Sequence, residues 1–213
     1  MGRWNIRWSI LLVLWCVTGV KLAAMKVESL DRGWFFNRGY ESQAADKVTV
    51  DLPHTWNAAD AMFGNVNYYR GMSTYSRFIV VPSSENFKRV FLRVKAAQTV
   101  ADVYLDNHFV AQHKGGYTSF TVEQTHLIRK GEKHKLDIRV SNAQTMEIAP
   151  ICGDFNIWGG LNRGVELLYT DDACIDPTFY GSSGVFFTQC DVSEKYAGLE
   201  PWQLYLAGPA GKP

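Results

Sequence analysis

The residues with the widest scope for chemistry lie in one short stretch, GDFNIWGGLNR at 153–163. It combines the carboxylate of Asp154 with two aromatic rings, a glycine pair, amides and an arginine. A carboxylate can accept strong, charge-assisted hydrogen bonds from two sugar hydroxyls. The composition is typical of a sugar-handling loop. It leaves three roles open for Asp154: a catalytic acid, a sugar-binding acid or an ordinary loop residue.

Glycoside hydrolysis would require a second carboxyl group. The two groups must stand roughly 5–10 Å apart across the scissile bond. Asp60 and Asp154 are the only pair of loop acids flanked by aromatic residues, amides and glycines. Most other acids, including Asp137 and Glu166, are expected on solvated strand faces or in turns. One pair of loop acids does not by itself identify a glycosidase, and we assign no catalytic residue.

Other chemistries have less support. No G-x-S-x-G elbow or glycine-rich phosphate loop occurs, and the histidines and cysteines lack metal-binding spacing. We therefore expect no metal and no cofactor. A formal net charge of +1, without long runs of one sign, argues against a nucleic-acid partner. Outside the N-terminal segment three cysteines remain, and free buried thiols are favoured over a Cys174–Cys190 disulfide.

The N-terminal segment has the layout of a secretory signal. Arg3 and Arg7 begin a basic region, the apolar run WSILLVLWCVTGV follows, and LAA ends at Ala24. We expect 1–24 to be a signal peptide that is cleaved near Ala24, which leaves a secreted or periplasmic chain with no membrane contact. The alternative is a membrane anchor, but the apolar run is shorter than the roughly 20 residues that span a bilayer.

The remaining chain is predicted to be β-structured. In KHKLDIRVSN (133–142) and KRVFLRVKA (88–96), apolar and polar residues alternate with a period of two. VADVYLDNHFVAQH (100–113) predicts a hairpin that turns at Asp106 and Asn107. Further strands are expected in four segments: KVTVDL (47–52), MSTYSRFIVV (72–81), SFTVE (119–123) and GVELLY (164–169).

Helix signals are nearly absent. The best candidate is a single turn in QTHLIRKG (124–131), capped by Thr125 and ended by Gly131. Short strands separated by polar or glycine-bearing turns predict an all-β fold, an antiparallel sandwich of two sheets. From the residues alone, the chain resembles a binding module more than an enzyme.

Five segments in a fixed order also carry a resemblance to a known family. They are GWFFNRG, VDLPHTWN, NYYRGMSTYSRFIV, VYLDNHFVAQHKGGYTSFTVEQT and GDFNIWGGLNRGVEL. This order resembles the N-terminal sugar-binding domain of glycoside hydrolase family 2, in particular secreted β-galactosidases of the Bacteroidota. The likeness runs from about Gly33 to about Leu199.

The resemblance implies a galactose-binding-like jelly-roll β-sandwich over 25–199. In the family this domain packs against an immunoglobulin-like sandwich and a TIM barrel, and the barrel supplies both catalytic glutamates. A barrel of roughly 250 residues does not fit beside the sandwich in 213 residues. The chain is therefore expected to be a non-catalytic fragment of a β-galactosidase-like enzyme, whose carbohydrate ligand is galactoside-like.

The resemblance also implies sugar contacts. Asp154 matches the aspartate that reaches from this domain into the barrel's active site, and Asn65 matches an asparagine with the same duty. Trp158 could offer a ring face to a sugar or pack under the glycine turn. Structural roles are expected for His54, and also for the arginines Arg70, Arg77 and Arg163 and the turn at Gly159 and Gly160.

Two departures from the family pattern stand out. GGLNR replaces the more usual Gly-Gly-Ile-Tyr-Arg, which removes a tyrosine ring near the site. After Leu199 the prolines and glycines of 200–213 break any strand pattern, so we expect an aberrant tail produced by a frameshift or truncation. Besides the fragment of a glycosidase, two alternatives stay open: a stand-alone carbohydrate-binding protein and an interaction sandwich without a ligand.

Overall fold

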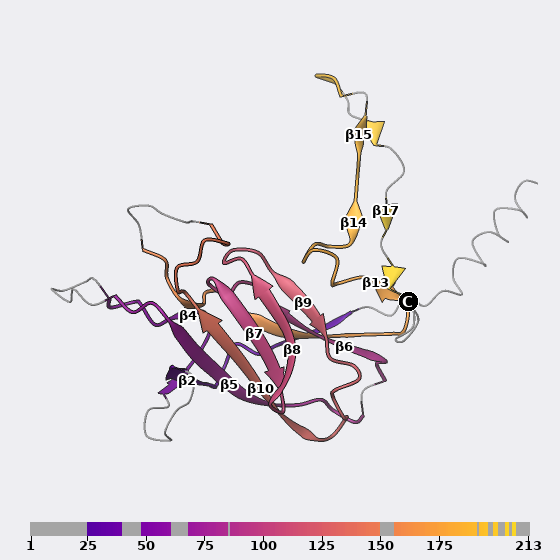
Figure 1. Cartoon of the computed structure of the whole chain (residues 1–213). Coiled ribbons are helices and arrows are strands. Elements are labelled where there is room, and N and C mark those ends of the chain that lie inside the picture. Colours follow the sequence, from indigo (N-terminus) through magenta and orange to yellow (C-terminus); the bar gives the residue numbers. More distant parts are fainter. Residues whose placement is uncertain are drawn as a thin grey trace, which may run out of the picture.

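The computed structural model describes residues 25–39, 48–60, 68–84, 86–149, 156–190 and 192–195, and the strand positions 198–199, 203–204 and 206–207. Within these ranges every element is a strand, and every strand pairing is antiparallel. Two sheets pack face to face as a jelly-roll sandwich, with a hairpin projecting from it (Figure 1). The described part contains no helix long and apolar enough to cross a membrane.

The larger sheet has six strands in the order β3-β2-β5-β10-β7-β8. Their bounds are Val48–Val50 (β3), Trp34–Arg38 (β2), Met72–Val80 (β5), Lys133–Ser141 (β10), Val100–Leu105 (β7) and His108–Lys114 (β8). The smaller sheet has four strands in the order β1-β12-β6-β9. These are Lys26–Ser29 (β1), Val165–Thr170 (β12), Arg89–Val94 (β6) and Phe120–Glu123 (β9).

The core lies between the sheets and follows from the alternation in the sequence. One face of each strand contributes apolar side chains, among them Leu136, Ile138 and Val140 of β10 and Val90, Leu92 and Val94 of β6. The register keeps these faces aligned: β10 pairs with β5 over nine positions, from Lys133 opposite Val80 to Ser141 opposite Met72. A shift of one residue would turn the apolar set outward, so burial fixes the pairing. The predicted fold class is confirmed.

The predicted hairpin is also confirmed. Asp106 and Asn107 have φ angles of +49° and +67°, the positive values that a type I′ turn requires at both central positions. Asp106 also accepts hydrogen bonds from Lys135 N (2.7 Å) and joins His134 Nδ1 (2.6 Å). The carboxylate therefore fastens the turn to the start of β10.

The predicted helical turn is wrong as an element. Turns occur at 125–127 and 130–131, and within this segment only Ile128 N reaches back four residues, to Gln124 O (3.0 Å). The Thr125 hydroxyl does not cap a helix, because it accepts from Val90 N (3.1 Å) and donates to Glu123 (2.7 Å). Groups near the start of β6 and at the end of β9 therefore bind the hydroxyl in place of the turn. Gly131, at φ +83°, does end the segment.

The expectation of solvated acids is wrong for Asp137 and Glu166, which are 4% and 7% exposed. Asp137 pairs with Lys135 Nζ at 2.7 Å. Glu166 pairs with Arg93 Nη1 at 3.2 Å and Lys95 Nζ at 2.8 Å. Alternation correctly placed both carboxylates away from the central core. It could not show that basic side chains would cover them.

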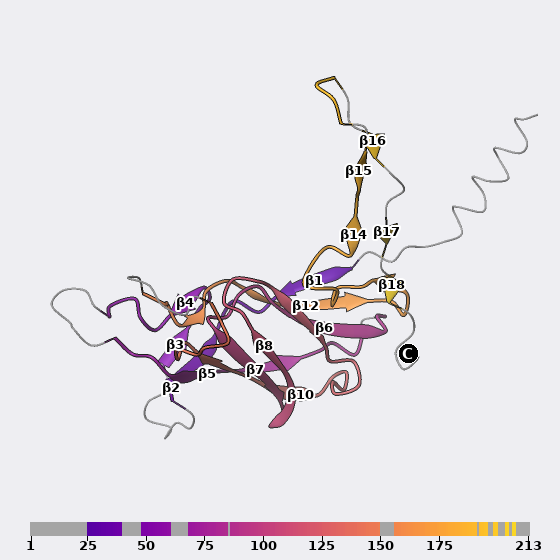
Figure 2. The ribbon, with the colours of Figure 1, turned by 45° about the horizontal axis from the view of Figure 1, so that its top comes forward.

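Beyond β12 the chain forms an extended hairpin, here called the arm (Figures 1 and 2). Its three pairings are β13 (Cys174–Ile175) with β18 (Leu206–Ala207), β14 (Val185–Phe186) with β17 (Gln203–Leu204), and β15 (Gln189–Cys190) with β16 (Gly198–Leu199). Strands β17 and β18 lie in the segment expected to break any strand pattern, so that expectation is wrong for these positions. Cys174 and Cys190 are free and half-buried rather than buried.

Candidate functional site

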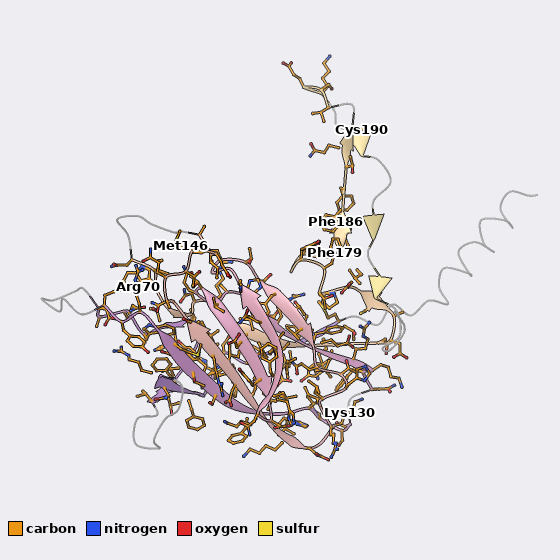
Figure 3. All side chains as sticks on the ribbon, in the orientation of Figure 1. Arg70, Lys130, Met146, Phe179, Phe186 and Cys190 are labelled. Carbon is orange, nitrogen blue, oxygen red and sulfur yellow. The ribbon has the colours of Figure 1, made fainter. Side chains whose placement is uncertain are left out.

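One end of the sandwich carries a set of loops that we call the rim, made of residues 55–60, 68–71, 142–144 and 156–160. Figure 3 shows Arg70 and Met146 at this end, with Lys130 at the other. Two short strands begin the rim: β4 (His54–Thr55) pairs with β11 (Gly160–Leu161). The Thr55 hydroxyl donates to Gly159 O at 2.8 Å, which secures the glycine turn.

The glycine pair is required for two different reasons. Gly160 has φ +137°, and a Cβ there would lie 2.3 Å from His54 O. Gly159 has no such φ, but a Cβ on it would lie 2.0 Å from the ring of Trp56. The prediction of positive φ is therefore confirmed for Gly160. At Gly159 the cause is close packing against an indole.

Two buried amides join the four rim segments, and we call Asn57 and Asn142 the amide hub. Asn142 Nδ2 donates to Asn57 Oδ1 (3.1 Å), Tyr69 O (3.2 Å) and Ile157 O (3.0 Å). Its Oδ1 accepts from Gly71 N at 2.9 Å. Asn57 Oδ1 accepts from Gly159 N at 2.8 Å. Both asparagines are fully buried, so the hub supplies hydrogen-bond partners to backbone groups that would otherwise be buried without one.

Asp60 is part of this scaffold and is not a free acid. It is 7% exposed, and its Oδ2 accepts from Asn57 Nδ2 (2.7 Å) and from Tyr69 N (3.0 Å). Burial beneath two donors leaves this oxygen no room to act on a substrate. Asp60 therefore stabilises the fold of its own loop. It is not a free acid that could form a catalytic pair with Asp154.

Asp154 and Asn65 both lie outside the described residues, as does Cys152. Described residues that follow each of them are hydrogen-bonded to each other, however. The Tyr68 hydroxyl, three residues after Asn65, donates to Ile157 O, three residues after Asp154. Asn142 Nδ2 spans the same two segments. The structure thus brings Tyr68 and Tyr69, which follow Asn65, close to Ile157, which follows Asp154.

Trp158 is the one predicted contact residue that the structure describes. Its side chain is 39% exposed, and its carbonyl accepts from Asn162 Nδ2 at 3.0 Å. The packing role under the glycine turn belongs instead to Trp56, which is 5% exposed and stacks on Phe36 with ring centres 6.1 Å apart. Trp158 is consequently left with a ring that is open to solvent at the rim.

Burial shifts the pKa values of one histidine and two tyrosines in or beside the rim in the direction that favours their neutral forms. Burial lowers the pKa of His54, whose Nδ1 lies 2.7 Å from the Tyr75 hydroxyl. Burial raises the pKa of Tyr75 and of Tyr68. The expected role of His54, a hydrogen bond that holds the loop, is confirmed. Among the described residues, no group of three His, Cys, Asp or Glu side chains could hold a metal ion.

Arg70 at the rim and Arg77 within β5 bind oxygen atoms other than carboxylates. Arg70 Nη1 donates to Gln144 Oε1 at 3.3 Å, and its guanidinium lies 5.5 Å from the Tyr68 ring centre. Arg77 donates to Leu30 O at 2.7 Å and to Arg32 O. Arg77 is structural as expected, although it binds carbonyls. Arg70 is exposed at the rim.

Asn57 and Asn142 were not singled out from the sequence. Each stands last in a segment that was, LPHTWN and KHKLDIRVSN. An asparagine that ends a strand can bind loop backbone on both its donor and acceptor sides, and this was the one available signal. Their 85-residue separation gave no sign that they meet.

Comparison with known proteins places this site in a family. Residues 47–150 match the model of the glycosyl hydrolase 2 galactose-binding domain-like family. A β-glucuronidase of Bacteroides fragilis is 40% identical over 168 residues, which are 79% of this chain and 24% of that protein. A β-galactosidase of Thermoanaerobacter pseudethanolicus is 29% identical over 134 residues, 62% of this chain and 18% of that protein.

Solved structures agree. An FMN-binding β-glucuronidase from Faecalibacterium prausnitzii L2-6 superposes with a TM-score of 0.77 at 34% identity, covering 87% of this chain and 28% of that one. A putative β-galactosidase from Bacteroides fragilis gives 0.74 at 31% identity, covering 82% and 27%. The chain thus spans about a quarter of the length of these relatives. It belongs to glycoside hydrolase family 2, as the galactose-binding-like N-terminal domain of that family.

Proposed function

We propose that this domain lends sugar-contacting side chains to the active site of a family 2 β-glycosidase and does not cleave glycosides by itself. The observation that carries the proposal is the amide hub. Together with the Tyr68 hydroxyl, it ties described residues that follow Asn65 to described residues that follow Asp154, next in sequence to the half-exposed Trp158. A buried, hydrogen-bonded scaffold of this kind is what precise positioning of sugar contacts requires.

Each of the three side chains would have its own task. The Asp154 carboxylate would accept hydrogen bonds from two sugar hydroxyls, and the Asn65 amide would donate one and accept another. The Trp158 ring would cover an apolar face of the sugar. Catalysis needs a pair of carboxyl groups across the scissile bond. We assign that pair to a barrel domain of the complete enzyme, because Asp60, the other candidate, is already engaged in the scaffold.

The substrate class that we propose is a β-glucuronide, with a β-galactoside as the second choice. Relatives of both kinds match the chain. The exposed guanidinium of Arg70 at the rim favours the anionic sugar, since a uronate carboxylate could pair with it. The proposed substrate class, which the sequence alone limited to β-galactosides, thus includes β-glucuronides as well.

We further propose that 1–24 direct the chain out of the cytoplasm. The support is the sequence layout of a basic start, an apolar run and small residues before Met25. A secreted fusion whose N-terminus begins at Met25 would bear this out. A mature protein that retains 1–24 would contradict it.

The lone chain provides the test of its non-catalytic role. Purified protein would be assayed with chromogenic β-glucuronides and β-galactosides, and titrated with the corresponding methyl glycosides. We expect no turnover and at most weak binding, because the chain would hold only part of a site. Turnover that Asp154→Ala abolishes would overturn the proposal. Millimolar or tighter binding without turnover would make the chain a stand-alone binding module.

A further inference from the structure

A second concave site lies away from the rim, at the base of the arm. It is a cleft of about 660 Å³ between the β8–β9 connection and the segment that follows β13. The β8–β9 side contributes His113 and 118–121, and the other side contributes Asp176 and 178–181. Figure 3 places Phe179 here, whereas Arg70 marks the distant rim. None of the rim residues lines the cleft.

The lining combines aromatic rings with hydrogen-bonding groups. Phe120, Phe179 and Tyr180 supply the rings, and three threonines, Ser119, His113 and Asp176 supply hydroxyl, imidazole and carboxylate groups. A pyranose has the matching character, with C–H faces for rings and hydroxyls at its edge for polar groups. The lining contains no lysine or arginine, so nothing in it would compensate the charge of an anionic ligand.

The polar groups are held in place and partly free to bind. Asp176 Oδ1 accepts from Thr178 N (2.8 Å) and from the Thr178 hydroxyl (2.6 Å). Its Oδ2 has no hydrogen-bond partner in the described part of the chain. His113 Nε2 lies 3.2 Å from the Thr118 hydroxyl, and its ring stacks on Phe120 with centres 4.4 Å apart. One carboxylate oxygen is therefore fixed in direction and open to a ligand hydroxyl.

The second side of the cleft is shaped by its backbone. Ser119 Oγ donates to Gly181 O at 2.9 Å, which fastens the two sides together. Gly181 has φ +63°, and a Cβ there would lie 2.1 Å from Ser119 O. Tyr180 adopts φ +49°, a left-handed conformation that is uncommon for a residue with a side chain, and it is 90% exposed. The fold thus keeps a nearly bare aromatic ring at the cleft, edge-on to Phe179 at 4.9 Å.

We propose that this cleft is a second carbohydrate site, which binds a neutral saccharide with Tyr180 as the ring platform and Asp176 as the acceptor for a sugar hydroxyl. The site is independent of the rim, so it would operate whether or not Asp154, Asn65 and Trp158 contact a substrate. Its role would be to retain the protein on glycans, without any bond being made or broken.

Isotope-labelled full-length chain titrated with lactose, cellobiose, xylobiose and N-acetyllactosamine would test the site by NMR. At least one of these sugars should shift backbone signals of 118–121 and 176–181 with a millimolar or tighter Kd. Tyr180→Ala should weaken that binding at least fivefold, and Tyr180→Trp should preserve it. Asp176→Asn should weaken it as well.

Two control variants separate the cleft from other surfaces. Tyr117→Ala removes a tyrosine that is 65% exposed, next in sequence to Thr118 but outside the lining, and should leave affinity unchanged. Phe109→Ala, which removes another exposed aromatic ring outside the lining, should also leave it unchanged. Shifts confined to the rim and sensitive to Trp158→Ala would overturn the cleft proposal while supporting the rim. No shift with any of the four sugars at 50 mM would overturn it too.

Discussion

At the scale of single residues, the side chain of Asn142 hydrogen-bonds to three other rim segments at once. Its amide meets backbone groups of Tyr69, Gly71 and Ile157 in addition to Asn57. The side chain is fully buried, so water cannot replace it. We expect Asn142→Ala to lower the free energy of unfolding by about 2–4 kcal/mol, because several buried polar groups lose their partners at once.

Urea denaturation would measure this change. The matched control is Asn86→Ala, at an exposed position, for which a change within about 0.5 kcal/mol is expected. Equal midpoints for the two variants would show that the hub does not hold the rim.

Glu123 should give the chain part of its resistance to acid. The hydrogen bond from Arg89 lowers the pKa of Glu123 below the ordinary 4.5, and the two side chains meet at 2.8 Å. The unfolded carboxyl thus takes up its proton at a higher pH than the folded one. The stabilisation is full above about pH 4.5 and is lost as the pH falls through the lower folded value.

The variant Glu123→Gln should therefore show a shallower loss of stability between about pH 5 and pH 3. Glu132→Gln is the control, since that carboxylate is 58% exposed and lies 3.8 Å from Arg129. Unfolding midpoints measured across the pH series would check the prediction. Unchanged pH dependence in Glu123→Gln would count against it.

What the sequence could reveal about single residues depended on local signals. The role of His54 and the left-handed glycine at Gly160 followed from the residue types and were right. The burial of Glu166 was missed, because the two bases that cover it, Arg93 in β6 and Lys95 just after β6, lie more than 70 positions away. Contacts between distant strands are set by register, which alternation alone does not specify.

At the scale of elements, the β7–β8 turn offers a sharp test. Asn107 sits at φ +67°, which an asparagine tolerates and a β-branched residue does not. We expect Asn107→Val to cost about 1–2 kcal/mol of stability. Asn107→Gly should hold stability at or above that of the natural chain, which thermal unfolding would show. A stable Asn107→Val variant would mean that the turn is not of type I′.

Strands were predictable where alternation was strong. Strands β3, β5, β6, β7, β9 and β10 fall within segments expected from the sequence, and β8 and β12 extend one residue beyond theirs. The short arm strands were not, because two-residue pairings carry no periodicity and prolines and glycines surround them. The single helical turn failed for a related reason. The Thr125 hydroxyl binds the neighbouring strand β6, and not its own turn.

At the scale of the whole molecule, the chain spans about a quarter of the length of its relatives, and the rim is the part of it that we propose contacts the sugar. The fold class and the family could both be inferred from ordered motifs. The contacts between the rim segments could not be inferred from the sequence, because only the folded sheets bring Asn57, Asn142 and Ile157 together. The domain limits of 25–199 stay a prediction.

The most direct test of the sugar-contact role uses a chimera. The segment of the Bacteroides fragilis β-glucuronidase that aligns with this chain would be replaced by the chain's own, and kcat/KM measured for a chromogenic β-glucuronide. Asp154→Ala in the chimera should lower kcat/KM by about 10-fold or more, the loss of a charge-assisted hydrogen bond. The exposed sheet residue Phe109, replaced by alanine, is the control and should leave kcat/KM unchanged. If the chimera is active and Asp154→Ala has the same kcat/KM as Phe109→Ala, the account is contradicted.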